Sequence, residues 1–246
     1  MWWPMGKYFF RPEERDGQYV YITGTVAHHM LNVLRFQVGQ DIILCDGACT
    51  DYNARLELIN MKPAGLKFVL VSSNPSNTET SLPIVLYQGL VKGDKMEWII
   101  EKCTELGVSR IIPVCTSRAV IKINALSKKT ERYARIAESA AAQSMRGIVP
   151  EVSQPFNFAQ ALEMCSSEEI ILVAHEKEVS HTLKSILPNI PPRPVVLWVG
   201  PEGGFDDSEV QALIEKGAFP ICLGPRILRT ETAGIVALAQ IQSIWE

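Results

Sequence analysis

Two short apolar runs near the C-terminus, each followed at once by Gly-Pro, constrain the fold more than any other part of the sequence. The runs Val195–Val199 and Phe219–Leu223 have the length and composition of fully buried strands in a parallel sheet. Between them, an aspartate at 206 or 207 can cap a helix that Gly217 ends. This segment therefore predicts an α/β fold in which a helix crosses over between the two strands.

The loops that follow these strands are Gly200–Phe205, the first loop, and Gly224–Thr230, the second loop. We expect both at the carboxyl ends of neighbouring strands, where open α/β sheets bind ligands. Their glycines let the backbone approach a ligand closely. The glycine spacing matches no nucleotide-binding fingerprint, so a dinucleotide site is not indicated. The alternative is that the loops are two tight turns without a ligand. In the second loop, Arg226 and Arg229 flank two apolar residues, which indicates a pocket for a flat ring beside an anionic partner. Thr230 is expected to cap the final helix.

Composition narrows the class of protein. The chain has 246 residues, of which 47% are hydrophobic and 21% charged, as in an ordinary globular protein with one large or two small domains. Its apolar start is too short to span a membrane, so we expect a cytoplasmic protein. The six cysteines lack zinc-site spacing and are expected to be buried thiols, with no metal. With a net charge of −3, any RNA-binding surface must be local, made from clustered arginines.

The first third of the chain differs in pattern from the rest. Short β-branched runs, YVYIT, DIILCDG, YNARLELI and LKFVLVS, fill residues 1–75 and predict a small β-barrel. Between the first two runs, one or two helical turns are expected from His28 to a stop at Gly39. The polar stretch at 72–83 is the expected linker.

After the linker, strands and helices alternate, which predicts an α/β domain. Asp94 and Glu97 form a capping pattern for one helix, and a long helix is expected from Ser127 to Arg146, ending at Gly147. The last helix, ETAGIVALAQIQSIW, is apolar nearly all round, so either its own domain or a second subunit must bury it.

The loop sequences GPEGGF and LGPRILRTETA resemble the paired cofactor loops of SPOUT-class RNA methyltransferases. The resemblance is strongest to the bacterial family (RsmE) that methylates N3 of a uridine in 16S ribosomal RNA, and VKGDKMEWIIEKCTELG and AESAAAQSMRGIVPEV share it. It implies a PUA-like RNA-binding β-barrel over 1–74 and a SPOUT methyltransferase domain with a parallel sheet over 81–246. It also implies a deep trefoil knot, over roughly 170–235, although knots are rare in proteins.

The resemblance implies S-adenosylmethionine as the cofactor. The residues implied to bind it lie in or beside the two loops, at the start of the last helix and at the end of an earlier strand: Leu172, Ala174, His175, Gly200, Pro201, Gly203, Gly204, Leu223, Gly224, Ile227, Leu228, Thr232 and Ala233. His175 and Glu176 together could instead be acid–base machinery, but the resemblance favours a cofactor contact through the backbone.

The resemblance also implies ribosomal RNA, in the assembled small subunit, as the partner, and a homodimer formed through the last helix. The residues expected to contact RNA are His29, Arg35, Lys92, Arg118, Gln143, Arg146 and Arg226. A packed histidine is the alternative for His29, and a solvated lysine for Lys92. The family's usual Arg-Phe-Phe start is replaced here by Lys7-Tyr8-Phe9-Phe10, in which the tyrosine can stack on a base.

Methyl transfer to uracil N3 needs an aligned nitrogen that has lost its proton. Arg229 is the first candidate to stabilise the uracil anion, whose charge spreads onto the two carbonyls beside N3. Glu202 either orients the first loop or helps to remove the proton. The resemblance therefore predicts an S-adenosylmethionine-dependent uracil-N3 methyltransferase. Ribose 2′-O methylation of RNA, or a non-catalytic RNA-binding ribosome-assembly protein, is the alternative.

Overall fold

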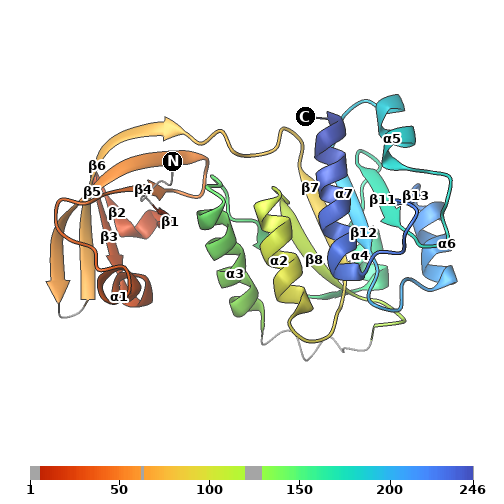
Figure 1. Cartoon of the computed structure of the whole chain (residues 1–246), viewed down its shortest axis with the longest axis horizontal. Helices are drawn as coiled ribbons and strands as arrows, with labels where there is room; N and C mark the ends of the chain where they lie inside the picture. The colour runs from red at the N-terminus through yellow and green to blue at the C-terminus, as the bar shows by residue number, and fades with distance from the viewer. Residues whose placement is uncertain (1–5, 62–63, 120–128, 246) are drawn as a thin grey trace. The chain divides into compact units, whose positions relative to one another are not determined.

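The computed structural model describes residues 6–61, 64–119 and 129–245, which form two compact units (Figure 1). Unit 1 comprises the chain up to Glu79 together with Ala141–Val149, and unit 2 comprises Thr80–Ala140 and Pro150–Glu246. The segment 141–149 thus belongs to unit 1, although the sequence pattern places it within the α/β domain. None of the helices in the described ranges is long and apolar enough to cross a membrane.

Unit 1 is built on one sheet of six strands in the order β1-β4-β5-β6-β3-β2, in which only the β1–β4 pair is parallel. Its core consists of alternate side chains from these strands together with Ala27 and Met30 of the helix α1. The predicted runs form strands as expected, but α1 begins at Gly24 and ends at Asn32, well before Gly39. The elements of unit 1 are β1 (Lys7–Phe9), η1 (Pro12–Glu14), β2 (Arg15–Asp16), β3 (Tyr19–Thr23), α1 (Gly24–Asn32), β4 (Asp41–Cys45), β5 (Thr50–Met61) and β6 (Ala64–Pro75).

Lys7, the first residue of β1, makes several polar contacts inside unit 1. Its side chain is fully buried, and its ammonium group lies 2.6 Å from the Asp51 carboxylate and donates to Ser76 Oγ and the Met145 carbonyl. Tyr8 is no free stacking platform, because its ring packs edge-on against Phe36 at 5.9 Å between centroids. Lys7 and Tyr8 therefore pack within unit 1.

The long helix predicted from Ser127 is shorter in the structure. The helix α3 runs from Thr130 to Gln143, while Ser127 itself lies outside the described residues. The helix does not continue to Gly147, because Met145 has a left-handed backbone with φ of 61° and the chain there joins unit 1.

Unit 2 is organised around a parallel sheet in the order β10-β8-β7-β12-β11-β13, with β9 beside β8. Its elements are β7 (Ile84–Gly89), α2 (Lys95–Glu105), β8 (Arg110–Cys115), α3 (Thr130–Gln143), β9 (Glu151–Val152), β10 (Phe156–Asn157), α4 (Phe158–Glu163), β11 (Ile170–Ala174), α5 (Leu183–Ile186), η4 (Leu187–Asn189), β12 (Val195–Val199), α6 (Asp207–Glu215), β13 (Phe219–Ile221) and α7 (Thr230–Trp245). This order confirms the α/β prediction.

Helices cover both faces of this sheet, as expected for strands that are apolar on both sides. On one face, Trp198 stacks on Tyr87 at 4.6 Å between ring centroids and packs with side chains of α4 and α6. On the other face, α2 packs on α7, and Gly234 of α7 lies against Leu86 and Cys103. Packing on both faces therefore holds the strands of the sheet in place, and with them the edge at which the strands end.

Two details of the sequence prediction are corrected in unit 2. The strands β12 and β13 are not neighbours, because β11 pairs with both and lies between them. Asp94 precedes α2 but makes no side-chain capping bond, and Glu97 instead pairs with Arg132 at 2.7 Å. By contrast, Asp206 caps α6 as predicted. The trefoil knot over roughly 170–235 stays a prediction.

Candidate functional site

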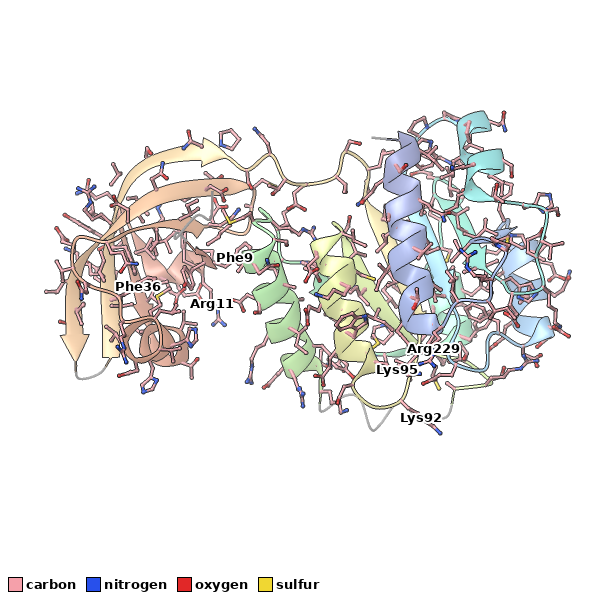
Figure 2. All side chains as sticks on the ribbon, viewed as in Figure 1. Phe9, Arg11, Phe36, Lys92, Lys95 and Arg229 are labelled. Atoms are coloured by element: carbon pink, nitrogen blue, oxygen red, sulfur yellow. The ribbon has the colours of Figure 1, made fainter. Side chains whose placement is uncertain are left out.

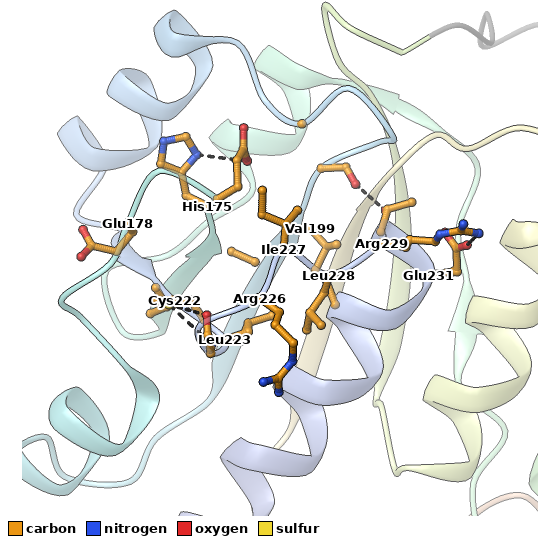
Figure 3. Close-up of a pocket in the computed structure, with 18 of the residues that line it drawn as sticks. His175, Glu178, Val199, Cys222, Leu223, Arg226, Ile227, Leu228, Arg229 and Glu231 are labelled. Carbon is orange, nitrogen blue, oxygen red and sulfur yellow. Dashed lines mark hydrogen bonds and ion pairs between the residues drawn. The ribbon is translucent and has the colours of Figure 1, made fainter.

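A cavity of about 1010 Å³ opens at the carboxyl edge of β11, β12 and β13 (Figure 3). Both loops line it, together with the residues that follow β11. The loops thus meet at one site although their strands are separated by β11. Parallel strands end at a common edge, so the intervening strand widens the site without dividing it.

The first loop folds tightly on itself. The Gly204 N–H donates to the Pro201 carbonyl at 3.0 Å, and Gly204 has a φ of 67°, in the region that glycine adopts without strain. A Cβ atom at Gly204 would lie 3.1 Å from a carboxylate oxygen of Glu176. Beneath the loop, Gly89 at the end of β7 approaches Pro201 so closely that a Cβ there would lie 2.5 Å from its nitrogen.

Arg118, expected to contact RNA, instead anchors the first loop in this structure. Its Nη1 donates to the Gly203 carbonyl at 3.2 Å, and its Nη2 lies 3.3 Å from Asp206 Oδ2. Asp206 caps α6 through Ser208, and these bonds together with Arg118 lower the pKa of the Asp206 carboxyl. The side chain is nevertheless 40% exposed, although Arg118 is not among the residues that line the cavity.

Glu202, at the tip of the first loop, is held by the segment after β7. Its carboxylate accepts the Lys92 backbone N–H at 3.1 Å and the Lys95 ammonium at 3.3 Å. Partial burial alone would raise the pKa of Glu202, but these hydrogen bonds outweigh it, and the pKa lies below its ordinary value. A carboxylate stabilised in this way is a weak base, so the geometry favours the orienting role. Lys92 itself is exposed at this end of unit 2 (Figure 2).

The second loop is open to solvent. Ile227 is 84% exposed, and the side chain of Arg229 is exposed to the same degree. The guanidinium groups of Arg226 and Arg229 point in different directions, and Arg229 faces Glu231 (Figure 3). Glu231 also lies 3.5 Å from Lys95, which therefore sits between two carboxylates at the rim.

Thr230 joins the two loops. Its hydroxyl group donates to the Gly200 carbonyl at 2.6 Å and accepts from the amide of buried Gln88 at 3.0 Å. Thr230 is not the helix cap that the sequence suggests. The N–H groups of Thr232 and Ala233 bond to the Arg229 carbonyl, so Arg229 occupies the capping position.

Most residues predicted to bind the cofactor do line the cavity. They are Ala174, His175, Gly200, Pro201, Gly203, Gly204, Leu223, Gly224, Ile227, Leu228 and Ala233, as do the predicted catalytic residues Glu202 and Arg229. Leu172, buried within β11, and Thr232 are not among the lining residues. The His175 N–H bonds to Ile221, and its carbonyl accepts from Glu178.

The residues predicted to contact RNA are spread over both units. Arg226 lines the cavity, while His29, Arg35 and Gln143 are exposed elsewhere. Arg146 departs from the prediction, because it is only 3% exposed and its Nη2 lies 2.5 Å from Glu79 in unit 1. An arginine buried against a carboxylate is not placed to bind RNA, so the structure assigns it to the interior of unit 1.

Several lining residues escaped the sequence analysis, above all Lys95, Glu178, Thr182, Cys222 and Glu231. Two of them could have been found. Lys95 opens the helix after β7, and Glu231 follows Thr230 directly, so both stand at the strand-end edge where the loops were expected. Among the described residues, no group of three or more histidine, cysteine or acidic side chains could hold a metal ion.

The chain matches the family model described as an RNA methyltransferase domain over residues 78–242, and the model described as an RNA methyltransferase PUA domain over 22–68. It is 38% identical over 230 residues to the ribosomal RNA small subunit methyltransferase E of Bacillus subtilis, covering 89% of this chain and 88% of that protein. The chain belongs to this family.

Further relatives agree with that assignment. The Synechocystis protein of the same name is 37% identical over 238 residues, covering 96% of this chain and 76% of that protein. The crystal structure of the ribosomal RNA small subunit methyltransferase E from Neisseria gonorrhoeae bound to S-adenosyl methionine matches with a TM-score of 0.87 and 33% identity. That match covers 98% of each chain.

Proposed function

We propose that this chain, as a member of the methyltransferase E family, transfers the methyl group of S-adenosylmethionine to N3 of one uridine in 16S ribosomal RNA. The observation that carries the proposal is the joint between the two loops. The bond from Thr230 to Gly200 brings both glycine-containing loops to one cavity, with Arg229 at its rim. This arrangement provides a cofactor pocket beside a cation that can meet a nucleobase.

The residues of the cavity suit S-adenosylmethionine. Pockets for ligands of this size enclose about 300–1,000 Å³, which agrees with the cavity volume. Apolar side chains, among them Val199, Leu223 and Leu228, can hold the adenine ring. The carboxylates of Glu176, Glu178, Glu202 and Glu231 line the same cavity and favour a ligand with cationic sulfonium and ammonium groups. When bound, the cofactor supplies the methyl group.

Arg229 is proposed to act on the nucleobase. Uracil N3 must lose its proton to attack, and the resulting charge spreads onto the carbonyl oxygens on either side of N3. The Arg229 guanidinium is exposed and lies 4.0 Å from Glu231, so its fork is not closed by a bidentate ion pair. It can therefore turn its N–H groups toward a uracil carbonyl and stabilise the anion.

We propose that residues 1–74 position the RNA, and that 81–246 carry the cofactor site. His29 and Arg35 are exposed on unit 1, and the left-handed φ of 55° at Arg35 marks a sharp turn there. The proposed substrate is the assembled small subunit in the cytoplasm. We also propose a homodimer formed through α7, because the apolar side chains of Ile235, Val236 and Ile244 on this helix are only partly buried.

Transfer of labelled methyl groups tests the proposal. Small subunits that lack the modification, and naked 16S RNA, are incubated with the protein and methyl-labelled S-adenosylmethionine. We expect label to enter RNA in the subunits faster than in naked RNA. Absence of transfer to both substrates would favour the non-catalytic assembly protein, and equal transfer to both would remove the assembled subunit from the proposal.

A further inference from the structure

Gln88, the penultimate residue of β7, lies beneath the site and takes no part in the cavity lining. Its side chain is completely buried, yet it ends in a polar amide. The amide nitrogen lies 3.0 Å from the Gly89 carbonyl, 3.0 Å from Thr230 Oγ1 and 3.4 Å from the Gly200 carbonyl. A buried amide at the meeting point of three chain segments needs a reason beyond packing.

The directions of these hydrogen bonds follow from the chemistry of the groups. Carbonyl oxygens can only accept, so the amide atom that faces Gly89 and Gly200 must be the donor nitrogen. For the same reason the Thr230 hydroxyl must donate its single proton to the Gly200 carbonyl. Its oxygen is then free to accept from Gln88. The relay therefore runs from Gln88 to Thr230 to Gly200.

β7, which carries Gln88, pairs with β12, but the relay also connects the two loops, whose strands β12 and β13 do not pair with each other. Gly200 begins the first loop after β12, whereas Thr230 closes the second loop after β13, and β11 lies between those strands. The Gly200 carbonyl accepts a hydrogen bond from the Thr230 hydroxyl of the second loop, and the Gln88 amide nitrogen of β7 lies 3.4 Å from it. Within the described part of the chain, the side-chain oxygen of Gln88, Oε1, has no hydrogen-bond partner. The side chain therefore acts only through its amide nitrogen, as a donor.

We propose that Gln88 is a positioning residue that fixes the two cofactor loops relative to each other through Thr230. The inference rests on the proposed function, because it assigns the cofactor to the cavity between these loops. Gln88 touches neither cofactor nor RNA. It holds the Thr230 hydroxyl in the one orientation that pins Gly200, so the gap between the loops is set before the cofactor binds.

A merely structural amide would act differently. Its loss would lower the stability of unit 2 and leave the affinity for S-adenosylmethionine unchanged. Gln242 provides the matched control, since it is also a glutamine in unit 2 whose amide donates to a backbone carbonyl, that of Leu106. Gln242 is not among the residues that line the cavity or join the loops.

The experiment measures two properties of the full chain: its affinity for S-adenosylmethionine, by calorimetry, and its thermal unfolding. Both are measured for the wild type and for Gln88→Met, Thr230→Val, Thr230→Ser, Gln242→Met and the double variant Gln88→Met/Thr230→Val. Loss of one buried neutral hydrogen bond that shapes the site predicts about tenfold weaker binding for Gln88→Met and Thr230→Val. Thr230→Ser keeps the hydroxyl and should bind like wild type. Because both residues act through one relay, the double variant should bind much more tightly than the product of the two single losses predicts.

Gln242→Met should lose stability and keep its affinity. Near-wild-type affinity of both Gln88→Met and Thr230→Val, or an equal loss of affinity in Gln242→Met, would overturn the positioning role. If Gln88→Met does not fold, the comparison of Thr230→Val with Thr230→Ser decides, and equal affinity of these two contradicts the relay. Failure of the wild type to bind S-adenosylmethionine would overturn the proposed function itself, and this inference with it.

Discussion

Arg229 Nη1 lies 4.0 Å from Glu231 Oε1 at the rim of the cavity, two residues apart on the turn that opens α7. The separation is too long for a tight bidentate pair, so the carboxylate orients the guanidinium without occupying its fork. The capping position of Arg229 fixes its backbone, because its carbonyl accepts from Thr232 and Ala233. A rigid backbone with an open guanidinium suits a residue that acts on a bound nucleobase.

Arg229→Lys should therefore slow methyl transfer at saturating substrates while leaving S-adenosylmethionine affinity nearly unchanged. Lysine keeps the charge but loses the planar fork, and removal of one such donor lowers kcat on the order of 100-fold, roughly 2.7 kcal/mol. Single-turnover rates measure the effect, and higher pH should restore part of it, because hydroxide then helps to remove the N3 proton. Arg226→Lys is the control with the smaller expected loss. A wild-type rate of Arg229→Lys at saturation would remove the catalytic role.

Gly204→Ala should weaken cofactor binding through the backbone of the first loop. At a φ of 67°, a Cβ atom costs about 1–2 kcal/mol, and here it also meets Glu176. Gly217→Ala carries a similar strain at a φ of 95° after α6, with open space around it. Calorimetry should show affinity lost about tenfold or more in Gly204→Ala and kept in Gly217→Ala. Equal affinities would mean that the first loop does not hold the cofactor.

Glu202→Gln separates the two roles considered for this carboxylate. If Glu202 orients the loop, the substitution should weaken cofactor binding a few-fold and leave the shape of the pH–rate profile unchanged. A general base would instead contribute about 10²–10⁴-fold to kcat, and its loss would reshape the profile. The lowered pKa of Glu202 and its bonds to Lys92 and Lys95 favour the first outcome.

The lowered pKa of Glu202 also predicts how stability changes with pH. A group whose pKa is depressed by folding stabilises the protein fully above its ordinary value, here 4.5, and loses that contribution as pH falls further. The free energy of unfolding of the wild type should therefore decline below about pH 4.5, and Glu202→Gln should decline less. Denaturant titrations between pH 3 and pH 7 measure both. Identical declines would mean that Glu202 gains nothing from its hydrogen bonds.

Arg146→Ala should destabilise unit 1 strongly. It leaves Glu79, which is only 18% exposed, without its charged partner, and removing one member of a buried ion pair typically costs about 3–5 kcal/mol. Arg55→Ala breaks the exposed pair with Asp41 in the same unit and should have little measurable effect. Urea unfolding monitors both variants. A small effect of Arg146→Ala, with RNA affinity lost instead, would restore the RNA-contacting role predicted from the sequence.

Local patterns in the sequence predicted the elements of unit 2 well. The run Val195–Val199 is β12 residue for residue, and Asp206 and Gly217 bound α6 because capping and left-handed backbone depend on near neighbours. The order of the strands could not be predicted in this way. Pairing of β11 between β12 and β13 depends on contacts distant in sequence, and no local pattern encodes it.

The same limit explains where the structure departs from the expectations drawn from the sequence. Nothing near Arg146 indicates that Glu79, 67 residues earlier, will bury it. The sequence motifs shared with the family located the two loops. They did not indicate the charged residues at the rim, Lys95 and Glu231, because these lie at the starts of two helices outside the loops. Gln88 carries no motif at all, and only its contacts in the folded chain show that it joins the loops.

The chemical identity of the product tests the central claim most directly. Unmodified small subunits are incubated with S-adenosylmethionine and the wild-type protein, and the 16S RNA is digested to nucleosides and analysed by mass spectrometry. The account predicts 3-methyluridine at a single position, formed by the wild type and at a strongly reduced rate by Arg229→Lys. A ribose 2′-O-methylated nucleoside, or no new methylated nucleoside, would contradict it.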